Sequence, residues 1–591
     1  MRVRLAVVLT LLAGLLAWPG IALAADPEPV KEPVAVGTGG AVASVDPLAS
    51  QAAIRVLQRG GNAVDAAVAA AAMLGVVEPY SCGIGGGGFM VIYRASDGSV
   101  TTIDSRETAP AAFEPDSFID PNTGQPISFS EAVTSGLGVG VPGTLLGWDV
   151  AARRYGTMRL PRLITPAISV AAGGFTVDQT FRDQTQSNLD RFRDFTSTRA
   201  VFLTPSGDSY PVGSTFRNPD LAETYGLIAD EGTAPFYRGE IADAIVETVQ
   251  HPPLRPGATR NVRPGLMELG DLAAYRAPER APTVITYRGL KVYGMGPPSS
   301  GGSTVGEALN ILEGYGLAAM NRVDALHYYL EASAFSFADR NQYLGDSDYV
   351  NVPLAGLLSD SYAAERRSSI GPTASTKPVP FGDPTDNEGP STTHLTVADR
   401  WGNVVTYTFT IESIGGSGIT VPGYGFLLNN ELTDFNFTPG TANSPDGGKR
   451  PRSSMSPTIV TSAGKPIVAV GSPGGSMIIT TVLQILVNHL DFGMTLPEAI
   501  AAPRASQRNT PNVFAEPAFI ASPEGQALRA LGHNYTTTAE IGAATGIAFF
   551  PGGLFQAVAE PVRRGGGSAM VAEPAPAAAS LGASARRARV H

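Results

Sequence analysis

The segment "GPSTTHLTVADRWGNVVTYTFT" at residues 389–410 leads from a proline-marked linker into two alternating runs. Asp-Arg-Trp-Gly-Asn at 399–403 separates the runs, and this arrangement predicts a β-hairpin. The stretch before it, residues 368–391, is rich in Pro, Gly, Ser and Thr, so we expect a mobile, exposed linker. Thr392, Thr393 and His394 stand at the boundary. On this local pattern alone, the simplest interpretation is an exposed loop that enters an edge strand, with His394 as a strand residue rather than a general base.

The N-terminal part of the chain alternates between helical and strand patterns. Residues 46–77 predict two helices, with Asp46 as N-cap of the first and Gly60-Gly61 at its end. Residues 87–110 then predict a hairpin whose turn is at Ser96–Ser99. No repeat of fixed period is present. This interleaving of helices and strands favours a layered α/β or α+β fold over a solenoid.

Both ends of the chain differ in composition from the rest. Residues 1–24 have a basic start, an apolar run and small residues at an A-x-A cleavage site, which predicts a signal peptide and export. The apolar run is short for a membrane anchor, and no later segment is long and apolar enough to cross a bilayer. Residues 25–44 are interpreted as a tether. The tail at 572–591 has low complexity, and we expect it to be disordered.

Several classes of function are disfavoured. The formal charge of −11 and the lack of a Lys/Arg-rich run argue against nucleic acid as a partner. The six histidines are scattered, so we expect no metal site. Gly138-x-Gly140-x-x-Gly143 contains Pro142 and lacks the acidic residue of a dinucleotide site, so no cofactor is expected. Cys82 is the only cysteine, which excludes an internal disulfide and indicates a small buried thiol.

Thr392 has a possible role beyond that of a strand residue. A threonine hydroxyl is a poor nucleophile and needs a base. If the chain is cut just before Thr392, the new α-amino group has a reference pKa of about 7.7–8.0, which suits a base near neutral pH. The residue would then carry nucleophile and base together, and the linker before it would let the new ends separate.

Polar groups downstream of Thr392 favour this chemistry. "KRPRSSMSP" offers the hydroxyl donors of Ser453 and Ser454. "GSPGGS" exposes the backbone N–H groups of Gly474 and Gly475 just before an apolar helical run, an arrangement that suits a developing oxyanion. Taken singly, these are also ordinary loop serines and turn glycines.

Charged groups complete the pattern. Glu431 and Asp434 in "LLNNELTDF" could hold an ammonium, and Arg106 in "DSRETAP" could clamp a carboxylate with two hydrogen bonds. The alternative for the acidic pair is a solvated surface pair. Together with the donors above, the charges describe an amino-acid-like substrate that carries an acyl group.

The chain resembles the γ-glutamyltranspeptidase (γ-glutamyltransferase) family of the N-terminal-nucleophile hydrolase superfamily, from about Val45 to about Met570. The stretches that carry the resemblance, in order, are "GGNAVDAAVAA", "EPYSCGIGGGGFM", "DSRETAP", "GVPGTLLGW", "YGTMRL", "GGFTV", "PPSSGGST", "ADRNQYLGD", "STTHLTV", "GFLLNNELTDF", "KRPRSSMSPTIV", "GSPGGSMIITTVLQ" and "APR". The resemblance implies an α+β fold arranged as a four-layer αββα sandwich. It also implies a precursor that cuts itself into a large subunit, 45–391, and a small subunit, 392–571, which stay together as a heterodimer.

The resemblance also implies roles for individual residues. Thr392 would attack the carbonyl of Ser391 to release itself, and would then take the acyl group from glutathione-like γ-glutamyl compounds and pass it to water, an amino acid or a peptide. The other implied roles are the following: Arg106, Ser453 and Ser454 on the substrate carboxylate, Glu431 and Asp434 on its ammonium, Gly474 and Gly475 as oxyanion hole, and Thr410 as hydrogen-bond partner of the nucleophile.

Two departures from the family pattern bear on the substrate. Glu412 stands where the best-known sites carry Asn; it is either a solvated loop carboxylate or an altered contact to the substrate ammonium. The connection at 436–448 is shorter than in many relatives, which have an aromatic lid there. We therefore expect water to compete well with acceptor amines, bulkier acyl groups to enter, and acyl groups such as glutaryl to be tolerated.

Two rival functions follow. One is an acylase on the same scaffold, acting on a glutaryl-β-lactam or another amide; it would be favoured by loss of Glu431 or Asp434, and both are present. The other is a non-catalytic exported binding protein, which predicts damage at Thr392 or at the glycine loop, and neither is damaged.

Overall fold

The computed structural model describes residues 29–381 and 392–575 of the chain. The predicted signal peptide, Ser391 and residues 576–591 of the predicted tail lie outside the described residues.

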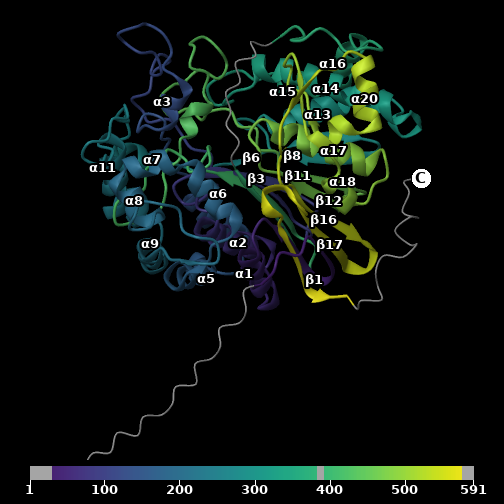
Figure 1. Cartoon of the computed structure of the whole chain (residues 1–591). Coiled ribbons are helices and arrows are strands. Elements are labelled where there is room, and N and C mark those ends of the chain that lie inside the picture. The colour runs from purple at the N-terminus through teal and green to yellow at the C-terminus, as the bar shows by residue number, and fades with distance from the viewer. Residues whose placement is uncertain (1–28, 382–391, 576–591) are drawn as a thin grey trace, which may run out of the picture.

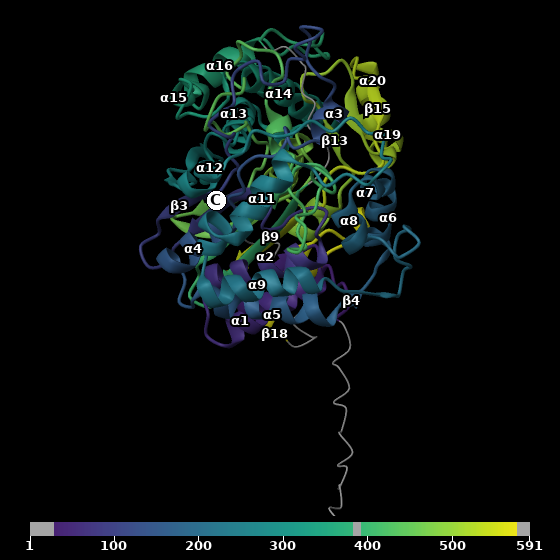
Figure 2. The same ribbon diagram turned by 90° about the vertical axis from the view of Figure 1, so that its left-hand side faces the viewer.

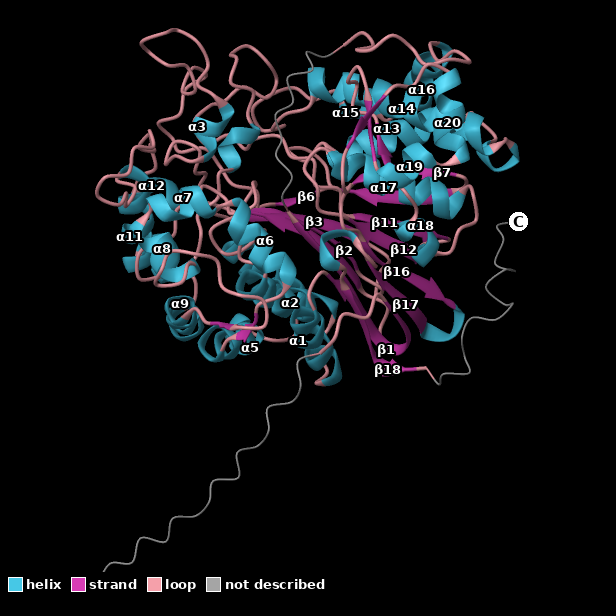
Figure 3. Cartoon of the chain, in the orientation of Figure 1, coloured by secondary structure: helices cyan, strands magenta, loops and turns pink. Residues whose placement is uncertain are grey.

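An antiparallel sheet of 13 strands runs through the molecule (Figure 1, Figure 3). Its strands, in order across the sheet, are β6 (Glu279–Arg280), β3 (Val100–Asp104), β2 (Gly87–Tyr93), β10 (Val404–Thr410), β9 (Thr393–Asp399), β1 (Val34–Ser44), β17 (Leu554–Ala559), β16 (Thr545–Phe550), β12 (Lys465–Gly471), β11 (Thr458–Ser462), β8 (Leu290–Gly294) and β7 (Thr283–Tyr287), with β18 (Ser568–Pro574) paired to β1. Two small sheets lie apart from it: β13 (Ala505–Ser506), β14 (Val513–Ala515) and β15 (Tyr535–Thr537), and β4 (Phe175–Thr176) with β5 (Thr215–Phe216).

Helices cover both faces of the large sheet, as Figures 1 and 2 show. The first core is built mainly by α1 (Pro47–Gln58), α2 (Ala63–Val77), α4 (Thr144–Tyr155), α5 (Leu160–Gly173), α9 (Pro219–Glu231) and α11 (Glu240–Gln250). The second core is built mainly by α13 (Gly301–Glu313), α14 (Arg322–Tyr343), α17 (Met477–Leu490) and α18 (Leu496–Ala501). The remaining helices are α3 (Phe129–Val133), α6 (Gln179–Ser187), α7 (Leu189–Asp194), α8 (Thr196–Phe202), α10 (Ala234–Arg238), α12 (Leu269–Ala274), α15 (Leu354–Leu357), α16 (Asp360–Ser368), α19 (Pro517–Ala521) and α20 (Pro523–Ala530).

The two cores follow from alternation along the central strands. In β2, Met90 and Ile92 enter the first core, whereas Phe89 and Val91 enter the second. Successive side chains of a strand point to opposite faces, so an unbroken apolar run such as β2 requires cover on both faces. The fold is therefore a mixed helix and sheet structure whose central strands are fully buried.

The helices and hairpins that were predicted from local sequence patterns are confirmed. The predicted pair at 46–77 is α1 and α2, and the Asp46 side chain accepts hydrogen bonds from the Leu48 and Ala49 N–H groups. The predicted hairpins are β2–β3 and β9–β10. The apolar run after the glycine loop is α17. Cys82 is buried, as expected.

The edge-strand interpretation of the opening segment is wrong. Strand β9 lies between β10 and β1 in the interior of the sheet, and every residue of β9 and β10 is buried.

The tether expected at 25–44 is also corrected, because Val34–Ser44 form strand β1, which pairs with β9, β17 and β18. Its glycines concealed the strand pattern. At Gly37 a Cβ atom would lie 2.2 Å from the Glu573 carbonyl oxygen, so the close approach of β18 requires glycine there. At the other end, β18 extends to Pro574, so the boundary of the predicted tail at 572 falls inside a strand.

The linker expected at 368–391 is held in place over its first half. The Ala374 N–H donates to the Leu531 carbonyl at 2.7 Å, and the Val379 N–H donates to Asn509 Oδ1 at 2.7 Å. Lys377 Nζ lies 2.8 Å from Glu331 Oε1 of α14. These contacts use backbone groups and a charge rather than apolar side chains, so the absence of an apolar period did not reveal them.

No helix within residues 29–381 and 392–575 is long and apolar enough to cross a membrane.

Candidate active site

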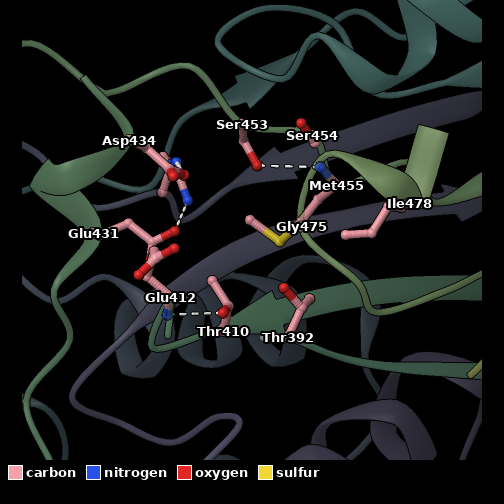
Figure 4. Close-up of a pocket in the computed structure, with 11 residues that line it drawn as sticks. Thr392, Thr410, Glu412, Glu431, Asp434, Ser453, Ser454, Met455, Gly475 and Ile478 are labelled. Atoms are coloured by element: carbon pink, nitrogen blue, oxygen red, sulfur yellow. Dashed lines mark hydrogen bonds and ion pairs between the residues drawn. The ribbon is translucent and has the colours of Figure 1, made fainter. Parts of the chain in front are cut away.

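A pocket brings the predicted residues together, as Figure 4 shows. The pocket is lined by Arg106, Thr392, Thr410, Glu412, Glu431, Asp434, Ser453, Ser454, Met455, Gly475 and Ile478. Of the residues predicted from the sequence, Gly474 does not line it, and Ser391 lies outside the described residues.

The central hairpin places the two threonines in the same pocket. Thr392 directly precedes β9 and Thr410 ends β10, and the ladder pairs Thr393 with Phe409. Thr392 and Thr410 adjoin this last pair and line the same pocket. The Glu412 N–H donates to Thr410 Oγ1 at 2.8 Å. Because this bond uses the oxygen as acceptor, the Thr410 hydroxyl hydrogen remains available to donate towards Thr392.

Thr392 has an unusual backbone. Its φ is +104°, and its side chain is only 5% exposed. A β-branched residue in this region is an outlier, and such outliers cluster at functional sites. Its carbonyl oxygen accepts a hydrogen bond of 2.9 Å from Arg564 Nη1. The sequence analysis missed Arg564, which lies 172 residues away along the chain.

Arg106 joins the two predicted charge clamps. Its Nη1 pairs with Glu431 Oε1 and its Nη2 with Asp434 Oδ2, and all three side chains are buried or nearly so. Nε and Nη2 also donate to the Pro451 and Arg452 carbonyl oxygens at 3.1 Å. The sequence analysis treated the carboxylate clamp and the ammonium clamp as separate, whereas the structure pairs them with each other. The solvated-pair alternative for Glu431 and Asp434 is therefore wrong.

The charges of the pocket do not balance. Its lining contains one guanidinium, from Arg106, and the three carboxylates of Glu412, Glu431 and Asp434. The neighbouring Glu107 is also fully buried, and neither of its oxygens has a hydrogen-bond partner within the described residues. Burial raises the pKa of Glu107 to about 8. Glu107 therefore carries its proton at neutral pH and does not compete with the pocket carboxylates for the positive charge of Arg106.

Glu412 is fixed inside the pocket. It has φ +75° and is 5% exposed. Its Oε2 accepts hydrogen bonds from Ser413 Oγ, at 2.5 Å, and from Asn430 Nδ2. The interpretation of Glu412 as a solvated loop carboxylate is thus wrong. Asn430 lies in the quoted "LLNNELTDF" motif, but nothing local to it points to Glu412.

The two serines are positioned by a loop that the sequence analysis left without a role. In "GPPSSGG", at 296–302, the Ser300 N–H and Oγ both donate to the Ser453 carbonyl at 2.7 Å. Arg340 of α14 donates to Ser300 Oγ at 2.8 Å and to Ser454 Oγ at 2.7 Å. The Ser454 hydroxyl, whose oxygen accepts from Arg340, can donate its hydrogen towards a bound anion.

The glycine loop stands between β12 and α17. Gly474 and Gly475 have φ of +135° and +56°, a region that favours glycine. Within the described part of the chain, neither N–H group finds an acceptor. Gly475 lines the pocket, and the Ile478 N–H donates to its carbonyl at the start of α17.

None of the histidines within residues 29–381 and 392–575 lines this pocket. His394 is fully buried and its ring contacts Thr408 Oγ1 at 2.8 Å, and burial lowers its pKa to about 3, so it is a neutral strand residue as predicted. His327, Glu331 and His533 lie close enough to share a cation, a cluster that the sequence analysis did not foresee. Lys377 already lies against Glu331, and the two imidazoles hydrogen-bond to each other at 2.9 Å.

The chain was compared with known protein families, sequences and structures. The profile described as "Gamma-glutamyltranspeptidase" matches residues 49–570. The chain is 41% identical over 555 residues to "Glutathione hydrolase proenzyme" of Bacillus subtilis (strain 168), covering 90% of this chain and 92% of the relative. It is 37% identical over 540 residues to the protein of the same name from Escherichia coli (strain K12), covering 88% and 90%.

Acylases are also similar. "Acylase ACY 1 proenzyme" of Pseudomonas sp. (strain V22) is 36% identical over 536 residues, which cover 89% of this chain and 92% of the relative. The crystal structure of cephalosporin acylase from Bacillus halodurans matches with a TM-score of 0.82 at 31% identity, over 93% of this chain and 98% of that one. Helicobacter pylori gamma-glutamyltranspeptidase matches with a TM-score of 0.54 at 34% identity, over 59% and 95%.

The buried charge pairing makes a testable prediction about stability. Arg106→Gln removes the guanidinium that pairs with Glu431 Oε1 and Asp434 Oδ2, so we expect the free energy of unfolding to fall by about 3–5 kcal/mol at pH 7.5. Without this guanidinium, the buried carboxyls have a folded-state pKa above the unfolded value, so the deficit shrinks as the pH falls through it and the groups become protonated. Urea unfolding at pH 7.5 and 5.5 measures both values. Arg154→Gln, which breaks an exposed ion pair with Glu279, is the control and should cost below about 1 kcal/mol. A deficit in Arg106→Gln that does not change with pH would contradict the pairing.

Proposed function

Because this chain belongs to the gamma-glutamyltranspeptidase family, we propose that it cleaves γ-glutamyl amide bonds of glutathione and related compounds through a γ-glutamyl ester on Thr392. The acyl group then passes to water, to an amino acid or to a peptide. The observation that carries the proposal is the buried charge set of Arg106, Glu431 and Asp434 beside Thr392 in one pocket.

The chain would first cut itself before Thr392. Its Oγ attacks the Ser391 carbonyl carbon, and the N-to-O shift breaks the Ser391–Thr392 amide, which frees the Thr392 amine and leaves Ser391 as an ester on Oγ. Water then hydrolyses that ester, which releases the Ser391 carboxylate and restores the Thr392 hydroxyl. In the mature protein this amine takes the proton of Oγ while Oγ attacks the γ-carbonyl carbon. The N–H groups of Gly474 and Gly475 stabilise the oxyanion, and the ammonium then protonates the leaving amine. Water repeats the sequence on the ester and releases glutamate.

The pocket charges suit a zwitterion. The α-carboxylate of a γ-glutamyl group would take the Arg106 guanidinium with the Ser453 and Ser454 hydroxyls, and its α-ammonium would take Glu431 and Asp434. A bound substrate would thus replace the ion pairs of Arg106 with Glu431 and Asp434 by two new sets of ion pairs. Arg106 would pair with the substrate carboxylate, and Glu431 and Asp434 would pair with its ammonium. A glutaryl group lacks the ammonium, so it would separate Arg106 from Glu431 and Asp434 without supplying a cation in its place, at a cost of several kcal/mol.

The order of strands supports two subunits that remain associated after the cut. Across the sheet, β6, β3 and β2 come from residues 45–391, β10 and β9 from the small subunit, and β1 again from before the cut. The strands β17, β16, β12 and β11 then follow from the small subunit, and β8 and β7 from the large one. Each part therefore completes the sheet of the other. We further propose the four-layer αββα arrangement of the superfamily, and export after removal of residues 1–24.

The cut and the nucleophile are tested together. We expect the purified protein to give two bands on a denaturing gel, with a new N-terminus at Thr392. Thr392→Ala should give one band and lose activity on a γ-glutamyl anilide by about 10³-fold or more. Thr393→Ala is a matched control at the next residue, because the Thr393 hydroxyl has no hydrogen-bond partner within the described residues. A Thr392→Ala protein that still processed and hydrolysed the anilide would refute the mechanism.

The second test separates this activity from that of an acylase. Asp434→Asn removes a charge that faces the substrate ammonium, so kcat/KM for γ-glutamyl anilide should fall about 10–100-fold, equivalent to about 1.5–3 kcal/mol. For glutaryl anilide, which has no ammonium, the change should stay below about threefold. Asp446→Asn, at an exposed aspartate of the nearby connection, is the control. Equal losses on both anilides, or a parent protein that prefers the glutaryl compound, would favour the acylase.

The third test concerns the acceptor. The connection at 436–448 contributes no lining residue to the pocket, and its Phe437 ring stacks on Phe118 at 4.2 Å instead. Little therefore covers a bound acyl group, and we expect free glutamate to be the main product even with a saturating dipeptide acceptor. Chromatography of the products measures the ratio. If the dipeptide captured most of the acyl group, the preference for hydrolysis would be wrong.

A further inference from the structure

Arg564 contacts the residue that the proposed function places at the centre of the chemistry, although it does not line the pocket. Its guanidinium donates from Nη1 to the Thr392 carbonyl at 2.9 Å. The arginine comes from the turn before β18.

The turn that carries Arg564 is held on several sides. Arg564 has φ +52° and ψ +38°, a conformation that few residues other than glycine adopt. Its N–H donates to Glu540 Oε2 at 3.0 Å, and its carbonyl accepts from Thr180 Oγ1 at 3.2 Å. The preceding Arg563 is bound to Glu516 at 2.5 Å and to Glu560 at 2.8 Å. The two consecutive arginines therefore bind different partners: Arg563 binds Glu516 and Glu560, and Arg564 binds the Thr392 carbonyl.

The contact has a mechanical consequence. Once the chain is cut, the residue is anchored only from its C-terminal side, by β9 and by the Arg564 hydrogen bond to its carbonyl. A reacting hydroxyl that is misplaced by even 1 Å loses much of its rate.

The contact also has an electrostatic consequence. The Thr392 amine is on the same residue as the carbonyl that accepts the hydrogen bond from Arg564. A guanidinium charge therefore lies close to the amine that must accept a proton. A like charge disfavours the ammonium form and lowers the pKa of the amine. Other titratable groups act on the same amine. Glu540 lies near Arg564, and so does Glu78, whose pKa burial raises to about 7. The pocket contributes Glu412, Glu431 and Asp434 together with Arg106, and Arg191 interacts with Glu412.

We propose that Arg564 is a positioning residue for Thr392, which fixes its backbone through the carbonyl and keeps its amine in the unprotonated form against the excess of carboxylates around it. This inference rests on the proposed function, because the amine exists only after the cut before Thr392. It assigns Arg564 to the proton-accepting step rather than to substrate binding.

The test is the pH profile of kcat/KM on a γ-glutamyl anilide. Arg564→Gln removes the charge, so the amine pKa rises and the acidic limb should move to higher pH by about 0.5–1 unit. At pH 7 kcat should fall about tenfold, with KM changed less than about twofold because Arg564 does not line the pocket. Arg564→Lys keeps the charge, so its acidic limb should stay at the parental pH while kcat falls by a smaller factor.

Arg217→Gln is the matched control, since this exposed arginine likewise donates to a backbone carbonyl, that of Gly173 at 3.0 Å. If Arg564→Gln keeps the parental acidic limb and kcat, the inference about Arg564 is wrong. The proposed function would stand, because this variant would still turn over the γ-glutamyl substrate. If Arg564→Gln remains uncut, Arg564→Lys decides. An unmoved limb with kcat/KM lowered no more than about threefold supports the role of the charge, and a limb shifted by half a unit or more refutes it.

Discussion

The antiparallel pairing of β9 with β10 in the middle of the large sheet is the constraint on which the site depends. Both strands are buried on both faces, so neither can slip by one residue without turning its apolar side chains from one core to the other. The register that this burial imposes brings Thr392 and Thr410 to the same pocket. The two loops that follow β10 and β12 then deliver Glu412 and the glycines to the same end of the sheet.

Around this hairpin the chemistry is governed by charges that are kept from water. Arg106 pairs with both Glu431 and Asp434, and the neutral Glu107 beside them avoids a further buried charge. As proposed above, this arrangement would suit a molecule with two opposite charges at amino-acid spacing better than one with a single charge.

Much of this could be predicted from the sequence, because the helices and hairpins have local signals. The cap at Asp46, the turn at Ser96–Ser99 and the alternation in β9 and β10 each lie within a few residues of what they determine. Most residues of the pocket could be found by their motifs. Their pairing could not: Arg106 and Glu431 are 325 residues apart, and Thr392 and Arg564 are 172 apart. Strand β1 was missed because its glycines serve a close crossing by β18 rather than a side-chain pattern.

The interleaving of strands across the sheet has a consequence for the lifetime of the protein. A single chain can unfold and refold by itself, but two chains whose strands alternate in one sheet can refold only after meeting, at a rate that depends on their concentration. The proposed cut would therefore turn folding into a one-way event. From that moment the molecule would persist because its unfolding is slow, rather than because it can return to the native state.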